Sequence, residues 1–173
     1  MAMTDAIMNW RRFLKRRNCS PHAVKNYLNI IKHFVIWLDM PVEEVTHATV
    51  SRYIEHLMRK RLAPKTVNCH LNGIRQFYHY LREEEGVAIP NPIRRSHIQK
   101  MSKPLPRHLR DEQVETFFNA IKGVRDRAMF MLMLRCGLRV EEVANLTIGV
   151  IDVRRRAILV EDGKGAKDRV VYT

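Results

Sequence analysis

The first half of the chain repeats apolar residues with the period of an α-helix. Between residues 4 and 17, and again from 21 to about 39, apolar side chains recur every three or four positions, with basic residues on the opposite face. Ser20 before Pro21 is typical of a helix start, because serine caps free N–H groups and proline suits the first turn. Similar patterns from about Thr46 to Arg61, and from Pro64 to about Leu81, predict two further helices. The short connections favour a small antiparallel bundle.

The second and fourth of these predicted helices have similar sequences. Written in register, "SPHAVKNYLNIIKHFVIWL" and "APKTVNCHLNGIRQFYHYL" match at several positions, although two amphipathic helices can arrive at such a likeness independently. Their polar faces combine positive charge with amide and imidazole groups, a mixture that suits a phosphate backbone together with base edges. The residues that form these faces are His22, Lys25, Asn26 and Lys32 in one helix, and Lys65, Asn68 and Arg75 in the other.

A proline-rich basic segment follows the predicted bundle. The stretch "VAIPNPIRRSHIQKMSKPLPRHL" has no sustained period, and proline removes backbone donors and disfavours helix before it. We therefore expect a helical domain over residues 1–88, an extended linker over 89–107 and a second domain over 108–173. The linker's charge would let it follow a phosphate backbone, with Lys103 and Arg107 as contacts, and an ordinary solvated linker is the alternative.

The last third of the chain changes from helix to strand. "RDEQVETFFNAI" predicts a helix with acidic residues in its first turn, and "VRDRAMFMLML" is apolar on nearly every side, which predicts a buried helix. Gly137 is expected to end that helix in a left-handed conformation. Beyond Asn145 the segments "VIDV", "RAILVED" and "DRVVYT" are rich in β-branched residues and predict a small antiparallel sheet. The fold class expected is mainly α, with an α+β second part.

Charge points to an anionic partner. Lys and Arg number 31 against 18 Asp and Glu, which gives a net charge of +13. Such a surplus costs self-repulsion, so nucleic acid is the first explanation and a merely basic surface is the alternative. The sequence holds no run of eighteen apolar residues and no secretory leader pattern, which favours a soluble cytoplasmic protein without membrane contact. The 3 cysteines are scattered and the 8 histidines lack ligand spacing, so we expect neither a metal nor a cofactor.

The stretch "GLRVEEVANL" places two charged residues where a short helix begins. Arg139 and Glu142 are three residues apart and so share one face. A cation at a helix N-terminus is mildly unfavourable, and a bound phosphate would resolve the conflict by meeting free N–H groups and a guanidinium. Lys164 lies in the glycine-rich turn "DGKGAK" between two strands, and the phosphate-loop spacing G-x-x-x-x-G-K-[ST] is absent there.

Taken together, "MLRCGLRVEEVANLTIGVIDVRRRAILVEDGKGAKDRVV" resembles the tyrosine recombinases, the family of phage integrases and Xer-type enzymes. In that family a GLR arginine opens a helix, an acidic residue follows three places on, and a GKG-x-K-x-R hairpin comes about 25 residues later. The upstream helices and "KPLPRHLRDEQVETFF" are similar to the family's core-binding domain, linker and first catalytic-domain helix. The resemblance implies a SAM-like four-helix core-binding domain and an incomplete catalytic domain.

The resemblance also implies roles for individual residues. Arg139 would bind and polarise the scissile phosphate, Glu142 would orient that arginine, and Lys164 would help to protonate the leaving 5′-hydroxyl. The expected partners are double-stranded DNA and, in the full-length family, other recombinase protomers in a tetrameric synapse. The residues expected to face DNA are His22, Lys25, Asn26, Lys65, Thr66, Asn68, Arg75, Lys103 and Arg107.

The sequence departs from the family pattern after the hairpin. Family members continue into an H-x-x-R element, a further His or Trp and a nucleophilic tyrosine, whereas this sequence ends at Thr173. Tyr172 falls in a predicted strand and is interpreted as a strand aromatic. We therefore expect DNA binding without cleavage. The alternatives are a non-enzymatic architectural or regulatory DNA-binding protein and, less consistent with the basic surface, a protein interaction module.

Overall fold

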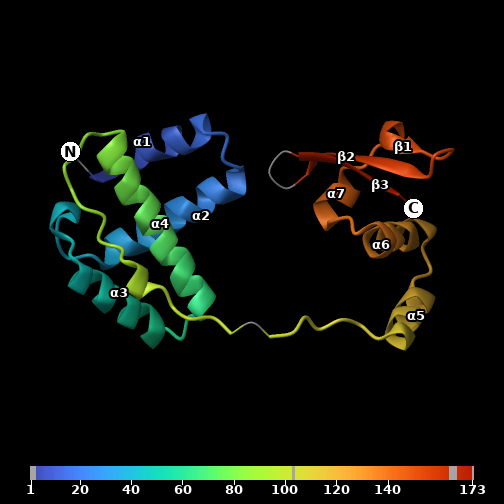
Figure 1. Ribbon diagram of the computed structural model, residues 1–173, viewed down its shortest axis with the longest axis horizontal. Coiled ribbons are helices and arrows are strands. Elements are labelled where there is room, and N and C mark those ends of the chain that lie inside the picture. Colours follow the sequence, from blue (N-terminus) through green and yellow to red (C-terminus); the bar gives the residue numbers. More distant parts are fainter. Residues whose placement is uncertain (1–2, 103, 164–166, 173) are drawn as a thin grey trace. The chain divides into compact units, whose positions relative to one another are not determined.

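The computed structural model describes residues 3–102, 104–163 and 167–172, and for residues 162 and 163 the backbone alone. Contacts divide the chain into two compact units, with the division between Pro104 and Leu105. The first is helical and the second combines helices with one sheet, so the predicted fold class is confirmed (Figure 1). Among the helices of the described residues, none has the length and hydropathy needed to cross a membrane.

The first unit is built from α1 (Met3–Arg16), α2 (Pro21–Trp37), α3 (His47–Arg59) and α4 (Pro64–Glu83). The Oγ of Ser20 accepts the Ala23 N–H at 3.2 Å, as the Ser-Pro pair predicts. The Oγ1 of Thr46 caps α3 in the same way, accepting from the N–H of Thr49. A short 3₁₀ turn, η1 (Val42–Glu44), precedes α3.

The core of this unit forms where α4 crosses α2 (Figure 1). Trp10 of α1 is fully buried and meets the ring of Phe77 edge-on, with 5.0 Å between the ring centroids. Gly73 of α4 lies against Ile30 of α2, and a Cβ added at Gly73 would lie 2.7 Å from the Cγ2 atom of Ile30. The two helix backbones can approach this closely because position 73 has no side chain.

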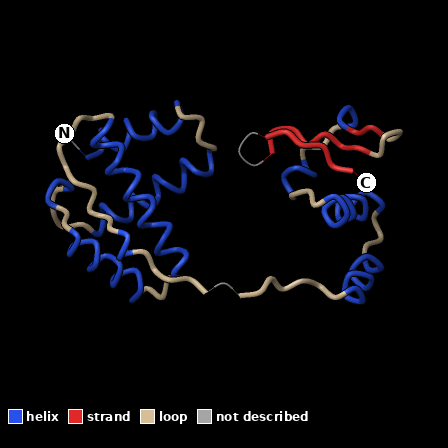
Figure 2. The backbone as a smooth tube through the Cα atoms, in the orientation of Figure 1, coloured by secondary structure: helices blue, strands red, loops and turns tan. Residues whose placement is uncertain are grey.

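The predicted linker differs from the structure in its first half. Residues 87–99 belong to the first unit and run beside its helices (Figure 2). Ile89 and Ile93 are buried in the core of this unit. The side chain of Asn91 donates to the carbonyl oxygen of Arg75 at 2.9 Å, and a 3₁₀ turn, η2 (Arg95–His97), follows. Two isoleucines spaced four apart among prolines carry too little periodicity to be recognised as core residues from the sequence. Figure 2 shows this segment, apart from η2, as a loop beside the helices.

The second unit contains α5 (Asp111–Ala120), α6 (Val124–Cys136), α7 (Val140–Ala144), η3 (Ile148–Val150) and an antiparallel sheet. The strands are β1 (Ile151–Asp152), β2 (Ala157–Gly163) and β3 (Lys167–Tyr172), in the order β1-β2-β3. Gly137 ends α6 with φ 63°, as predicted. The small core contains Leu138, Val143 and Val160.

The expectation that α6 is a buried helix is wrong. None of its residues is buried, and Phe130 and Leu134 remain 38% and 51% exposed. Met129, Leu132 and Met133 pack against the small core, so within the described residues one side of the helix is covered and the others face outward. An all-round apolar helix indicates burial only if neighbours surround it.

We expect Gly73→Ala to destabilise the first unit by about 1–3 kcal/mol through overpacking, although alanine otherwise favours a helix. The reason is the stiff branched side chain of Ile30, which cannot move aside at small cost. Urea unfolding measures the change, with Gly149→Ala as a control because nothing lies within 4 Å of a Cβ there. In an Ile30→Ala background the cost of Gly73→Ala should largely disappear; an unchanged cost would contradict this packing.

Candidate functional site

A carboxylate flanked by two guanidiniums lies on α7 of the second unit. The Nη1 of Arg139 donates to Glu142 Oε1 at 2.7 Å, and the backbone N–H of Arg139 donates to Oε2 at 2.8 Å. Arg169 of β3 donates from Nη1 to Oε1 at 2.8 Å and from Nη2 to Oε2 at 2.7 Å. The sequence-predicted pair Arg139 and Glu142 is therefore brought together, and a third residue joins it.

The register of the sheet explains how Arg169 reaches α7. Arg169 pairs with Val160, and directly opposed residues of antiparallel strands lie on the same face. Val160 packs with Leu138 and Val143, and Val171, two residues after Arg169, contacts the same core. Arg169 therefore projects from the face that packs against α7, beside Glu142.

The three side chains differ in exposure. The Glu142 side chain is 8% exposed, that of Arg169 is 34% exposed and that of Arg139 is 57% exposed. Hydrogen bonds from Arg169, then from the backbone and side chain of Arg139, hold the pKa of Glu142 well below its usual range. The bonds to Glu142 also raise the pKa of Arg169. The cluster carries two positive charges and one negative charge, and its most exposed member is a cation.

Two expectations for this site stay predictions or lie outside the described residues. The backbone N–H of Arg139, at the cap of α7, is bonded to Glu142, so this one N–H is engaged; the prediction of a phosphate at the start of the helix stays a prediction. Glu142, itself an anion, also offsets the conflict of a cation at the start of α7. Lys164 lies outside the described residues, and so does Lys103 of the linker.

The sequence-predicted polar residues of the first unit lie mostly on its surface. His22, Lys25 and Asn26 of α2 are exposed, as are Lys65 and Thr66 of α4. Arg75 is partly exposed. Arg107 of the connection is exposed as well.

Asn68 makes a contact that was not predicted from the sequence. Its Nδ2 donates to the carbonyl oxygen of Gln99 at 2.9 Å, and its Oδ1 accepts the Gln99 N–H at 2.8 Å. The amide thus pairs with one backbone residue as a neighbouring strand would, and it fastens the connecting segment to α4. Its position in an amphipathic helix gives no sign of this role, because the partner is 31 residues away.

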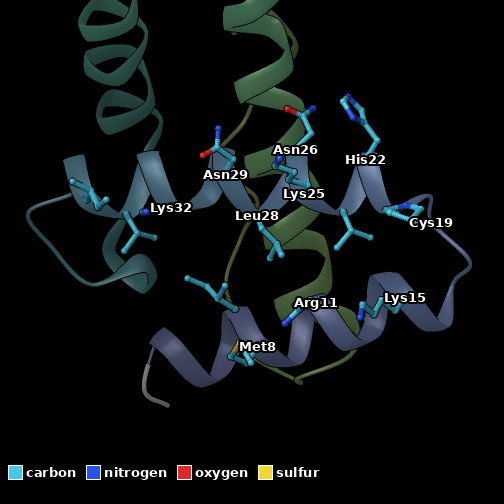
Figure 3. A pocket seen from close by; sticks show the side chains of 15 residues that line it. Met8, Arg11, Lys15, Cys19, His22, Lys25, Asn26, Leu28, Asn29 and Lys32 are labelled. Carbon is cyan, nitrogen blue, oxygen red and sulfur yellow. The ribbon is translucent and has the colours of Figure 1, made fainter.

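A groove of about 1040 Å³ lies between α1 and α2 (Figure 3). Its floor is apolar, with Leu28 pointing into it, and no Asp or Glu is among the described residues that line it. Its cations are Arg11 and Lys15 of α1 and Lys25 and Lys32 of α2. His22 and Asn26 also line the groove, from the edge of α2 that is farther from α1 (Figure 3). The exposed side of α2 therefore combines cations with imidazole and amide groups.

Among the residues described, no three His, Cys, Asp or Glu side chains gather closely enough to hold a metal ion. Cys19, Cys69 and Cys136 are free thiols. The chemistry that the second unit offers is that of a guanidinium held in place by a carboxylate, which suits a phosphate oxygen.

Comparisons with known proteins agree on one family. Residues 7–86 match the phage integrase N-terminal SAM-like domain and residues 107–173 match the phage integrase family. The chain is 34% identical over 164 residues to tyrosine recombinase XerC of Oceanobacillus iheyensis, which covers 90% of this chain and 53% of that protein. It is 32% identical over 163 residues to tyrosine recombinase XerD of Pseudomonas putida, and the match covers 90% of this chain and 54% of that protein. The chain thus spans about half the length of the curated relatives it matches.

Solved structures show the same fold. A lambda integrase dimer bound to a COC′ core site has a TM-score of 0.80 at 16% identity, with 100% of this chain and 60% of that chain covered. The Tn1549 transposon integrase in complex with circular intermediate DNA has a TM-score of 0.68 at 17% identity, with 97% and 60% covered.

The lowered pKa of Glu142 predicts a pH dependence of folding. A folded pKa below the unfolded one means that the carboxylate's contribution is complete above the ordinary glutamate value of about 4.3 and is lost progressively below it. We expect Glu142→Gln to be less stable at pH 7 and to lack this acid-dependent loss. Urea midpoints between neutral pH and about pH 2 measure it. Glu141→Gln, which removes an exposed charge from the same helix, is the control; identical pH profiles for both variants would contradict the expectation.

Proposed function

The chain belongs to the phage integrase family of tyrosine recombinases, and from this membership we propose that it is the DNA-binding portion of a site-specific recombinase. Such an enzyme cuts and rejoins double-stranded DNA through a 3′-phosphotyrosine intermediate. The observation that carries the proposal is the cluster on α7, in which a carboxylate fixes the Arg139 guanidinium while 57% of that side chain stays exposed.

In this proposal the first unit holds the duplex. The exposed residues of α2 and α4 donate from cationic, amide, imidazole and hydroxyl groups, which suit phosphates and base edges. The contacts proposed are His22, Lys25, Asn26, Lys65, Thr66 and Arg75, with Lys103 and Arg107 in the connection. Asn68, which was also expected to face DNA, has a different role in this proposal. Its amide bonds the backbone of Gln99 and so holds the connection against α4, beside the proposed contacts.

The second unit supplies the chemistry at the phosphate. Phosphoryl transfer needs positive charge against the phosphate oxygens and a proton for the leaving oxygen. Arg139 would polarise the phosphate, Glu142 would orient that arginine, and Lys164 would protonate the 5′-hydroxyl. Other copies of the recombinase would be the protein partners, as in the family's tetrameric synapse.

We further propose that residues 1–173 bind DNA without cleaving it. In the family that this chain resembles, the H-x-x-R element and the nucleophilic tyrosine come after the GKG-x-K-x-R hairpin, a region that residues 1–173 do not include. The two H-x-x-R strings within residues 1–173, at 56–59 and 79–82, lie in α3 and α4 of the first unit. Tyr172 lies in β3, paired with Ala157, in the context of a strand rather than of a nucleophile.

Binding of duplex DNA by this chain should weaken steeply with salt, with a log-log slope near −0.9 for each phosphate neutralised. Lys25→Ala and Lys65→Ala should each weaken binding and reduce that slope by about 1. Fluorescence anisotropy with a labelled duplex between 50 and 200 mM salt measures both. Arg82→Ala on α4 is the matched control, because its charge is already paired with Glu83 at 2.7 Å. A slope near zero would refute the proposed interface.

Incubation of the chain with nicked duplex DNA should give no covalent protein–DNA adduct on denaturing electrophoresis. The physical reason is that Tyr172, the tyrosine of the second unit's described residues, lies in β3 opposite Ala157 and is interpreted as a strand aromatic. A band that survives denaturation and disappears in Tyr172→Phe would show that Tyr172 is a nucleophile after all.

A further inference from the structure

Arg169 makes a two-pronged contact with the carboxylate of Glu142. Its two terminal nitrogens reach the two oxygens at 2.8 and 2.7 Å, across a separation of 27 residues. A bidentate guanidinium contact fixes the plane of a carboxylate as well as its position. Each oxygen of Glu142 therefore accepts one bond from Arg169 and one from Arg139.

We propose that Arg169 is a positioning residue that acts on the phosphate through Glu142 and Arg139 rather than by its own contact. The inference rests on the proposed function, since it concerns how the phosphate-binding arginine is held. Arg139 and Glu142 belong to the same short segment and could turn together. Arg169 comes from β3, so it ties that segment to the sheet.

Burial supports this division of roles. The terminal nitrogens of Arg169 are both engaged by Glu142, and its side chain is 34% exposed against 57% for Arg139. Within the described residues, Arg139 uses one terminal nitrogen for Glu142, which leaves the greater part of its guanidinium surface facing outward. The more exposed arginine is the one suited to meet a phosphate, and the less exposed one is suited to hold the carboxylate.

Charge gives Arg169 a second effect that must be separated from geometry. With Arg169 the three groups sum to +1, from two cations and one anion, and without it Arg139 and Glu142 sum to zero. Lysine at position 169 keeps the charge but, as a point charge, cannot reproduce the fork. Arg169→Lys therefore tests orientation, and Arg169→Leu tests orientation and charge together.

The experiment is a double-mutant cycle on duplex DNA affinity, measured by anisotropy at one fixed salt concentration. Arg169→Lys and Arg169→Leu are each made in the natural chain and in an Arg139→Ala background. Arg154→Leu, which removes an exposed cation from the turn after β1, is the charge-matched control. Thermal unfolding shows whether each variant is folded. If Arg169→Leu does not fold, the comparison of Arg169→Lys with the natural chain tests the proposal.

We expect each Arg169 change to weaken binding by roughly 10-fold when Arg139 is present, the scale of a lost charge-assisted hydrogen bond, and by under about 2-fold when it is absent. The Arg154→Leu control should have little effect. An equal loss in both backgrounds would mean that Arg169 contacts DNA itself, and full affinity in Arg169→Lys would mean that charge alone matters. Either result overturns the proposal.

A second readout separates this inference from the proposed function. If the natural chain does not bind duplex DNA, the proposed function fails, and carbon-13 NMR titration of the Glu142 carboxyl then tests Arg169 by itself. Loss of the fork should raise the pKa of Glu142 in Arg169→Lys and Arg169→Leu. An unchanged pKa in both variants would show that Arg169 does not hold the carboxylate.

Discussion

The second unit depends on one carboxylate placed between two guanidiniums. Two cations that converge on a short helix repel each other, and the repulsion grows where water is excluded. Glu142 removes that repulsion by accepting from both while its own side chain is almost buried. The apolar core beside it is small, with Leu138, Val143 and Val160 as its buried members. Polar bonds at Glu142 therefore join α7 to the sheet where apolar packing is thin.

The helices of the first unit were readable from the sequence, because each depends on signals that lie within it. The three-to-four periodicity predicted α1 to α4, and the Ser20–Pro21 pair predicted the start of α2. Gly137 was predicted to be left-handed for a similar local reason. The pair Arg139 and Glu142 could be found because residues three positions apart share one face where a helix begins. The hydrogen bond between them follows from that spacing.

The remaining features depend on partners far away in the sequence. Arg169 reaches Glu142 because the strands pair in one register, and a shift of one residue would turn its side chain to the other face. The GKG-x-K-x-R spacing contained Arg169, but its partner could not be named without the sheet. Asn68 looked like a surface residue because an amide that bonds a distant backbone has the same helical position as one that faces solvent. Local patterns report which face a residue occupies, not what covers that face.

The clamp between Asn68 and Gln99 shortens the tether between the two units. The connection from residue 89 to residue 110 divides near its middle at this clamp, and the first half is held against the helices through Ile89, Ile93 and Asn91. For a tether, the effective concentration of one module near the other falls roughly as the −3/2 power of length. Halving the tether therefore raises that concentration about threefold. The Asn68 amide thus acts on avidity together with these contacts, because they decide how much chain separates two surfaces that would bind the same molecule.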